Sequence, residues 1–139
     1  MGVTGSRRAK KFEDLDVYQE SLKLQQEIFH FSKKWPIEER YSLIDQIRRS
    51  SRSVGANLAE CWAKRRYLPH FTSKLTDSDG ELSETKHWLL TAKLCGYLDD
   101  ENYNALVNQA KSIGRSIGSM IRNAEKWVQK APKTERQVD

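Results

Sequence analysis

Residues 46–66 read QIRRSSRSVGANLAECWAKRR, and the spacing of their small and apolar residues predicts a long helix. From residue 44 onward such residues recur at steps of three and four, which places them on one helical face: Ile44, Ile47, Ser51, Val54, Leu58 and Cys61. We predict that this helix spans residues 42–67 and ends before Pro69. The quoted stretch also carries six cations against one acid, Glu60, so its outer face is a candidate binding surface.

Three further segments repeat this rhythm: residues 15–35, 70–98 and 100–127. In the second of them, DSDG at 77–80 is typical of a turn, but Leu75, Leu82 and Leu89 keep their phase across it, so we predict an unbroken helix. Gly96 then supplies a stop, and the aspartates after it an N-cap for the last helix. The sequence therefore predicts an all-α protein, an antiparallel up-down-up-down four-helix bundle over residues 12–129.

The segment 15–35 has two apolar stripes instead of one. We place the stripe of Leu15, Leu22 and Phe29 toward the bundle core. A face this wide predicts a neighbour outside the bundle, and small residues on the outer face of 42–67 would let another backbone approach. We therefore predict a contact between protomers formed by Val17, Leu24, Ile28, Phe31, Trp35, Ala56, Ala59 and Ala63. The alternative is that the alanines, as good helix formers, simply tolerate exposure.

The formal net charge of +5 is concentrated at the two ends of the chain. Residues 1–11 carry four cations and no acid, and residues 130–139 carry three cations and two acids, so residues 12–129 are neutral overall. We predict a disordered basic arm over 1–11 and a flexible tail over 130–139. No apolar run approaches the roughly 20 residues that span a bilayer, and we expect a cytoplasmic protein.

Two Glu-x-x-His pairs have the spacing that di-metal sites use in four-helix bundles, namely Glu27 with His30 and Glu84 with His87. On a helical wheel both pairs lie outside the predicted core stripes, where they cannot share a buried metal. The chain also lacks a Ser–His–acid arrangement and a glycine-rich phosphate loop. We therefore expect no enzyme activity, no metal and no cofactor, and we expect core positions for Cys61 and Cys95.

Four strings carry a resemblance to a known family: FEDLDVYQ at 12–19, ERY at 39–41, QIRRSSRSVGANLAECWAKR at 46–65 and LCGYLDDENY at 94–103. Over about residues 12–128 the chain resembles the four-helix-bundle proteins encoded in intervening sequences of bacterial large-subunit ribosomal RNA genes. The resemblance implies a ring-like homopentamer without enzymatic activity. These proteins are similar to the accessory protein of diversity-generating retroelements, which implies reverse transcriptase and RNA as partners. The chain departs from the family at Cys61, where glycine is usual, and at 76–80, TDSDG.

The leading functional hypothesis is a non-catalytic oligomeric scaffold that binds nucleic acid, with structured RNA as the expected ligand, through phosphate contacts. The candidate contacts lie on the outer faces and ends of two helices: Arg49, Arg52, Lys64, Arg65, Arg66, Lys111, Arg115, Arg122 and Lys126. Aromatic residues do not alternate with cations on the predicted exposed faces, so we expect low sequence specificity. Two alternatives stay open: an adaptor that recruits a reverse transcriptase or nuclease, and cations that serve only solubility.

Overall fold

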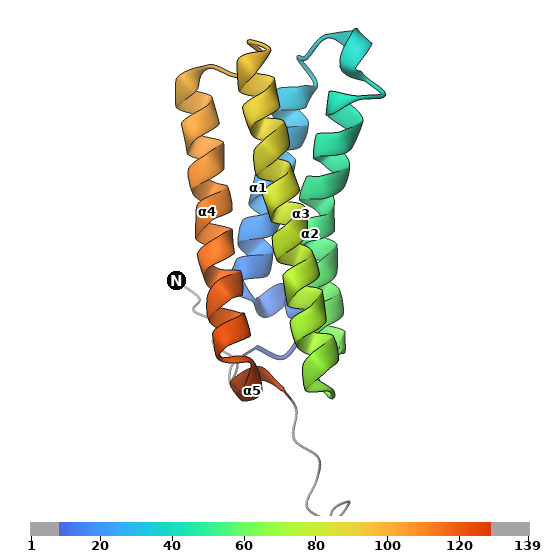
Figure 1. Cartoon of the computed structure of the whole chain (residues 1–139), viewed down its shortest axis with the longest axis vertical. Helices are drawn as coiled ribbons and strands as arrows, with labels where there is room; N and C mark the ends of the chain where they lie inside the picture. Colours follow the sequence, from blue (N-terminus) through green and yellow to red (C-terminus); the bar gives the residue numbers. More distant parts are fainter. Residues whose placement is uncertain (1–8, 129–139) are drawn as a thin grey trace, which may run out of the picture.

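The computed structural model describes residues 9–128, which form four long helices without a strand (Figure 1). The long helices are α1 (Asp16–Ser32), α2 (Leu43–Ala63), α3 (Leu68–Leu94) and α4 (Asp100–Arg122). The short ones are η1 (Phe12–Asp14), η2 (Ile37–Glu39) and α5 (Ala124–Trp127). Most of the predicted arm, at residues 1–8, and the whole predicted tail lie outside the described residues. Within residues 9–128, no helix has the length and apolarity needed to cross a membrane.

The four long helices lie side by side, and each contacts two others. α1 packs against α2 and α4, and α3 packs against the same two helices. Within residues 9–128, α2 and α4 make no contact with each other, so they occupy diagonal corners of the bundle. The α1–α2 and α3–α4 connections lie at one end of the bundle and the α2–α3 connection at the other (Figure 1).

The core stripes predicted for α2 and α3 are confirmed. Every residue of the predicted α2 stripe is buried, as is every residue of the α3 stripe, which continues through 77–80 without a break. Buried hydroxyl groups form hydrogen bonds between α2 and α3. Ser78 Oγ donates to the Val54 carbonyl at 2.8 Å, and Thr85 Oγ1 donates to Ser50 Oγ at 2.9 Å. Because these buried hydroxyls are paired, the two helices approach closely without an unsatisfied polar group.

The phase predicted for α1 is wrong along the helix, although Leu15 at its N-cap is buried as predicted. Val17, Leu24, Ile28 and Trp35 are buried within the single chain, whereas Leu22 and Phe29 are only partly buried. The four buried side chains therefore belong to the core of the protomer and do not form an outer face for a neighbour. The physical reason is that α1 must cover both α2 and α4, so the stripe that faces between them is the buried one. Phe31, also assigned to the contact, is partly buried and packs against the core.

The predicted boundary between α3 and α4 is confirmed. Gly96 has a φ of +82°, which only glycine adopts without strain, and the Gly96 N–H bonds the Lys93 carbonyl at 2.9 Å. Asp99 caps α4 by accepting a 2.7 Å hydrogen bond from the Asn102 N–H. Three details differ from the prediction: α3 ends at Leu94 instead of residue 98, the last helix breaks at Asn123 before α5, and Cys95 is exposed on the helix end instead of lying in the core.

Residues 9–11, which precede α1, make contacts that the sequence does not predict. The N–H groups of Lys10 and Lys11 donate to Asp14 Oδ2 at 3.0 and 3.2 Å, and Ala9 packs against the core. These hydrogen bonds to the carboxylate lower the pKa of Asp14, that from Lys10 contributing most. Residues 9–11, which the sequence assigned to the arm, are therefore tied to the bundle.

A hydrogen bond links the two connections at one end of the bundle. The Tyr97 hydroxyl donates to Glu39 Oε2 at 2.8 Å, and the same carboxylate accepts from Ser42 Oγ at 2.6 Å. The hydrogen bond from Ser42, followed by that from Tyr97, lowers the pKa of Glu39. The hydrogen bond to Glu39 raises the pKa of Tyr97 to about 12.

We expect Tyr97→Phe to destabilise the protein in a pH-dependent way. Because the folded pKa of Glu39 is lowered, its contribution is present above the ordinary glutamate pKa of about 4.3 and is lost as the pH falls. Because the folded pKa of Tyr97 is raised to about 12, its contribution is present below the ordinary tyrosine pKa of about 10 and is lost as the pH rises toward 12. Urea unfolding of the unaltered protein and of Tyr97→Phe should be measured from acidic to alkaline pH. The difference between their free energies of unfolding should vanish at both ends of this pH range. A difference that stays constant with pH would contradict the assignment.

Candidate nucleic-acid interface

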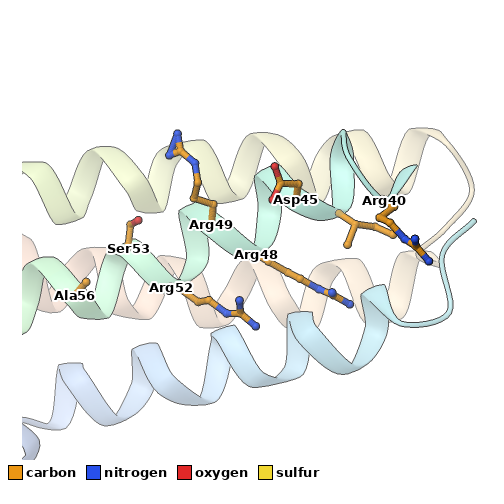
Figure 2. A pocket seen from close by; sticks show the side chains of 8 residues that line it. Arg40, Asp45, Arg48, Arg49, Arg52, Ser53 and Ala56 are labelled. Atoms are coloured by element: carbon orange, nitrogen blue, oxygen red, sulfur yellow. The ribbon is translucent and has the colours of Figure 1, made fainter. Parts of the chain in front are cut away.

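The outer side of α2 and the turn before it form an open groove of about 490 Å³ (Figure 2). Four of the side chains that line the groove are arginines and one is an aspartate. The full lining is Arg40, Ile44, Asp45, Arg48, Arg49, Arg52, Ser53 and Ala56. Arg48 and Arg52 lie one helical turn apart, because a step of four residues returns a side chain to the same side of a helix. Within residues 9–128, none of the four arginines forms an ion pair. The groove therefore holds an excess of positive charge.

Contacts to α1 fix two of these arginines in place. Arg48 Nε donates to Ser32 Oγ at 2.9 Å, and its guanidinium lies 4.7 Å from the centre of the Phe29 ring. Arg52 lies over the same ring at 5.6 Å. In Figure 2 both side chains extend along the side of α2 that faces α1, while Arg49 points to the opposite side. The groove is thus bordered by cations on both sides of α2, and contacts to α1 position the two on one side.

The electrostatics of the groove favour an anion. Burial lowers the pKa of Arg48, and repulsion from the charge of Arg52 lowers it further. An arginine stays protonated at neutral pH even with a lowered pKa, so both charges persist next to each other. A phosphate between them would neutralise this repulsion and accept bidentate hydrogen bonds.

The cations predicted at the end of α2 differ in their availability. Lys64 and Arg66 are exposed. Arg65 is partly buried: its guanidinium stacks 3.5 Å from the centre of the Trp62 ring, and Arg65 Nε donates to the Trp62 carbonyl at 2.8 Å. Burial also lowers the pKa of Arg65. This side chain covers the end of the core and is a weaker candidate for a phosphate contact than its neighbours.

The cations predicted on the last helix do not join the groove. Lys111 and Arg115 are exposed on α4, which sits at the corner of the bundle diagonal to α2. Arg122 and Lys126 instead line a separate hollow of about 410 Å³ beside the start of α3. A single protomer therefore carries separate basic regions, and the nine predicted residues do not form one continuous surface.

Sequence reasoning missed two of the groove's cations, Arg40 and Arg48. Their signal was present in the sequence, because residues 40, 44, 48 and 52 recur at steps of four. Arg40 precedes the helix and Arg48 borders the core stripe, so neither lies on the outer face that this stripe defines. Glu60, the single acid of residues 46–66, pairs with Lys74 of α3 at 3.0 Å.

The side chains considered for a metal site are engaged elsewhere or exposed. Glu27 accepts a 2.9 Å hydrogen bond from Gln109 Nε2, and Glu84 accepts one of 3.1 Å from Trp88 Nε1. His30 and His87 are exposed. In the part of the chain that the structure describes, no three potential metal ligands come together.

The outer alanines lie where the sequence placed them. Ala56 and Ala63 are exposed on α2, and Ala59 is partly buried. Ala56 also lines the groove, so the face that a neighbouring protomer would use borders the basic surface. Contact between protomers through these alanines stays a prediction.

Comparison with known proteins places this bundle among relatives. The family model described as 23S rRNA-intervening sequence protein matches residues 13–119, which include every residue of the groove. Among solved structures, a protein of unknown function from the S23 ribosomal protein family of Bacteroides thetaiotaomicron VPI-5482 is similar, with a TM-score of 0.69 and 28% sequence identity. That similarity covers 76% of this chain and 95% of the other. No curated protein matches the chain.

Proposed function

Because the chain belongs to the 23S rRNA-intervening sequence protein family, we propose that it is a non-catalytic scaffold that binds structured RNA. The protomer is an antiparallel up-down-up-down bundle, and protomers assemble as a ring-like homopentamer in the cytoplasm. Contacts to RNA are made to phosphates, and sequence specificity is low. The observation that carries this proposal is the arginine groove on α2, where four guanidinium groups face one carboxylate.

Assembly would turn a weak site into a useful one. The groove of one protomer offers only a few phosphate contacts, and such contacts weaken steeply with salt. A ring repeats the groove around its axis, and linked sites gain affinity when one RNA can reach several of them. The small outer residues Ala56, Ala59 and Ala63 support an oligomer because they let a second backbone approach α2.

Charge reversal in the groove tests the proposal. Near 50 mM salt the intact protein should bind a hairpin RNA, and Arg49→Glu with Arg52→Glu should weaken binding and flatten the salt dependence. Each phosphate contact contributes about 0.9 to the slope of log affinity against log salt, so the slope should fall by about 2 for each engaged protomer. Fluorescence anisotropy at several salt concentrations measures both quantities.

The matched control reverses two charges far from the groove. Lys111→Glu with Arg115→Glu changes the net charge of the protein equally but acts on α4, diagonal to α2. Its slope should stay close to that of the unaltered protein. Equal losses in both double variants would place binding outside the groove, and a lack of RNA binding by the intact protein near 50 mM salt would end the scaffold proposal.

A second candidate function rests on apolar side chains at one end of the bundle. Ile37 of η2 and Leu94 at the end of α3 are 75% and 77% exposed, and Leu90 one turn earlier is also exposed. Exposed apolar patches commonly mark protein interaction sites. These residues favour an adaptor that docks a partner such as a reverse transcriptase. Loss of binding to a purified reverse transcriptase in Leu94→Lys, with unchanged RNA affinity, is the expected result for an adaptor.

A further inference from the structure

The turn that leads into α2 presents an aromatic ring beside the arginine groove. Tyr41 is 84% exposed, the highest exposure among the large hydrophobic side chains of residues 9–128. Its ring centre lies 5.8 Å from the guanidinium of Arg40, which lines the groove. In Figure 2, Arg40 lies at one end of the groove, and Arg48, Arg49 and Arg52 follow along α2. An exposed aromatic ring thus lies beside Arg40, at one end of the arginine groove, a combination that the sequence alone did not predict.

We infer that the arginine groove binds an unpaired nucleic-acid strand, with phosphates on Arg48, Arg49 and Arg52 and one base stacked on Tyr41. This inference rests on the proposed function and names the part of the RNA that the site takes. The face of an aromatic ring stacks on a base only when that base is free of its own neighbours. A duplex keeps its bases stacked, so it can use the arginines but not the tyrosine.

The geometry of α2 suits a short strand. From Leu43 to Arg52 the helix rises roughly 14 Å, at about 1.5 Å per residue, so only a few nucleotides can follow the groove. Arg48 and Arg52 stand one turn apart on the α1 side, and Arg49 stands on the other side of the groove. Phosphates can therefore be held from both sides along one line that ends at Arg40 and Tyr41.

The preorganisation of the cations supports this assignment. Ser32 Oγ and the Phe29 ring hold Arg48 before any ligand arrives, so little side-chain freedom is lost on binding. Arg40 beside the ring adds a cation that can pair with the phosphate of the stacked nucleotide. Since every base has an aromatic face, stacking on one tyrosine tolerates any sequence.

The test compares single-stranded and duplex ligands in Tyr41 variants. Labelled oligouridine RNA of about 12 nucleotides, and a duplex RNA of the same length, are titrated into the full-length protein near 50 mM salt. Tyr41→Ala should weaken binding of the single strand roughly 5- to 150-fold, the range expected for losing one stacked base, and leave duplex affinity unchanged. Tyr41→Phe should retain affinity because the aromatic face remains. Thermal unfolding followed by circular dichroism should be unchanged, since the side chain is exposed.

Tyr67 supplies the matched control. It is also an exposed tyrosine, at 55%, but it belongs to the α2–α3 connection at the opposite end of the bundle (Figure 1). Tyr67→Ala should bind the single strand as the unaltered protein does. Oligothymidine DNA of the same length tests whether the strand is RNA or DNA. Equal affinity for both assigns recognition to phosphates and bases, and a preference for RNA adds a contact to the 2′-hydroxyl. Both results support the inference.

Three outcomes separate this inference from the proposed function. If Arg49→Glu with Arg52→Glu weakens binding but Tyr41→Ala does not, the scaffold proposal stands and the single-strand inference is wrong. The inference is also wrong if Tyr41→Ala weakens single-strand and duplex binding equally. If neither variant alters binding of any nucleic acid, both are wrong.

Discussion

Replacing Leu24 by Asp is expected to unfold the protomer. Leu24 is 1% exposed on the buried face of α1, so the variant loses the burial of a leucine and places a carboxylate among apolar side chains. Leucine truncation in a core costs about 2–5 kcal/mol, and burying an unpaired charge costs several kcal/mol more. The sum reaches the total stability of an ordinary domain, about 5–15 kcal/mol. Far-ultraviolet circular dichroism at room temperature should therefore show loss of helix.

This result distinguishes a Leu24 buried in the core of the protomer, as in the structure, from a Leu24 at a contact between protomers, as the sequence predicted. A Leu24 at a contact between protomers would give a folded monomer in the aspartate variant, because only the assembly would be disturbed. Ala56→Glu is the matched comparison, since Ala56 is exposed on α2. That variant should keep its helix content and, if α2 contacts a neighbour, show a smaller mass by light scattering. A folded, monomeric Leu24→Asp protein would contradict the burial of this side chain.

α2 and α3 could be predicted from the sequence because each has a single stripe. In α3, Leu75, Leu82 and Leu89 recur every seven residues, and the other leucines near its end, Leu90 and Leu94, do not extend into a second stripe along the helix. The stripe alone then fixes which side is buried, even across 77–80, where local propensity favours a turn. Tertiary packing overrides the weak local preference there, because Ser78 of this stretch bonds the backbone of α2.

α1 could not be phased in the same way because its two stripes are similarly apolar. Leu22 and Phe29 on one stripe compete with Leu24 and Ile28 on the other, and only the surfaces of the neighbouring helices decide between them. α1 buries the stripe that lies between α2 and α4. Phe29 is only partly buried, and the guanidinium groups of Arg48 and Arg52 lie over its ring.

The candidate site was only partly predictable for a related reason. The outer position of Arg49 and Arg52 follows from the α2 stripe, and both line the groove. The anchoring of Arg48 depends on Ser32, a residue 16 positions away on another helix, which no local pattern reveals. The exposure of Tyr41 depends on the path of the α1–α2 connection, and the stacking of Arg65 on Trp62 depends on side-chain rotamers.

Gly55→Leu is expected to destabilise the protein by about 3 kcal/mol, because α1 and α2 touch at this glycine. A Cβ atom at Gly55 would lie 3.0 Å from Ser21 Oγ and 3.5 Å from Tyr18 Cε1. Ser21 cannot move freely, since its hydroxyl donates a 2.6 Å hydrogen bond to the Tyr18 carbonyl. A leucine must therefore push α1 away from α2 or distort the first turns of α1. Urea unfolding at a fixed protein concentration measures the loss.

Gly80→Ala should instead stabilise the protein, and it serves as the control for replacing a glycine inside a helix. Gly80 lies inside α3, and an added Cβ would meet no atom within 4 Å. Alanine is favoured over glycine in a helix interior by about 0.5–1 kcal/mol, so this variant should be more stable by that amount. Because both substitutions remove a glycine's backbone freedom from the unfolded chain, a loss in Gly55→Leu beside a gain in Gly80→Ala comes from crowding at Gly55 and not from replacing a helical glycine. If Gly55→Leu were as stable as Gly80→Ala, α1 would not pack against α2 at this point, and the buried phase of α1 would have to be revised.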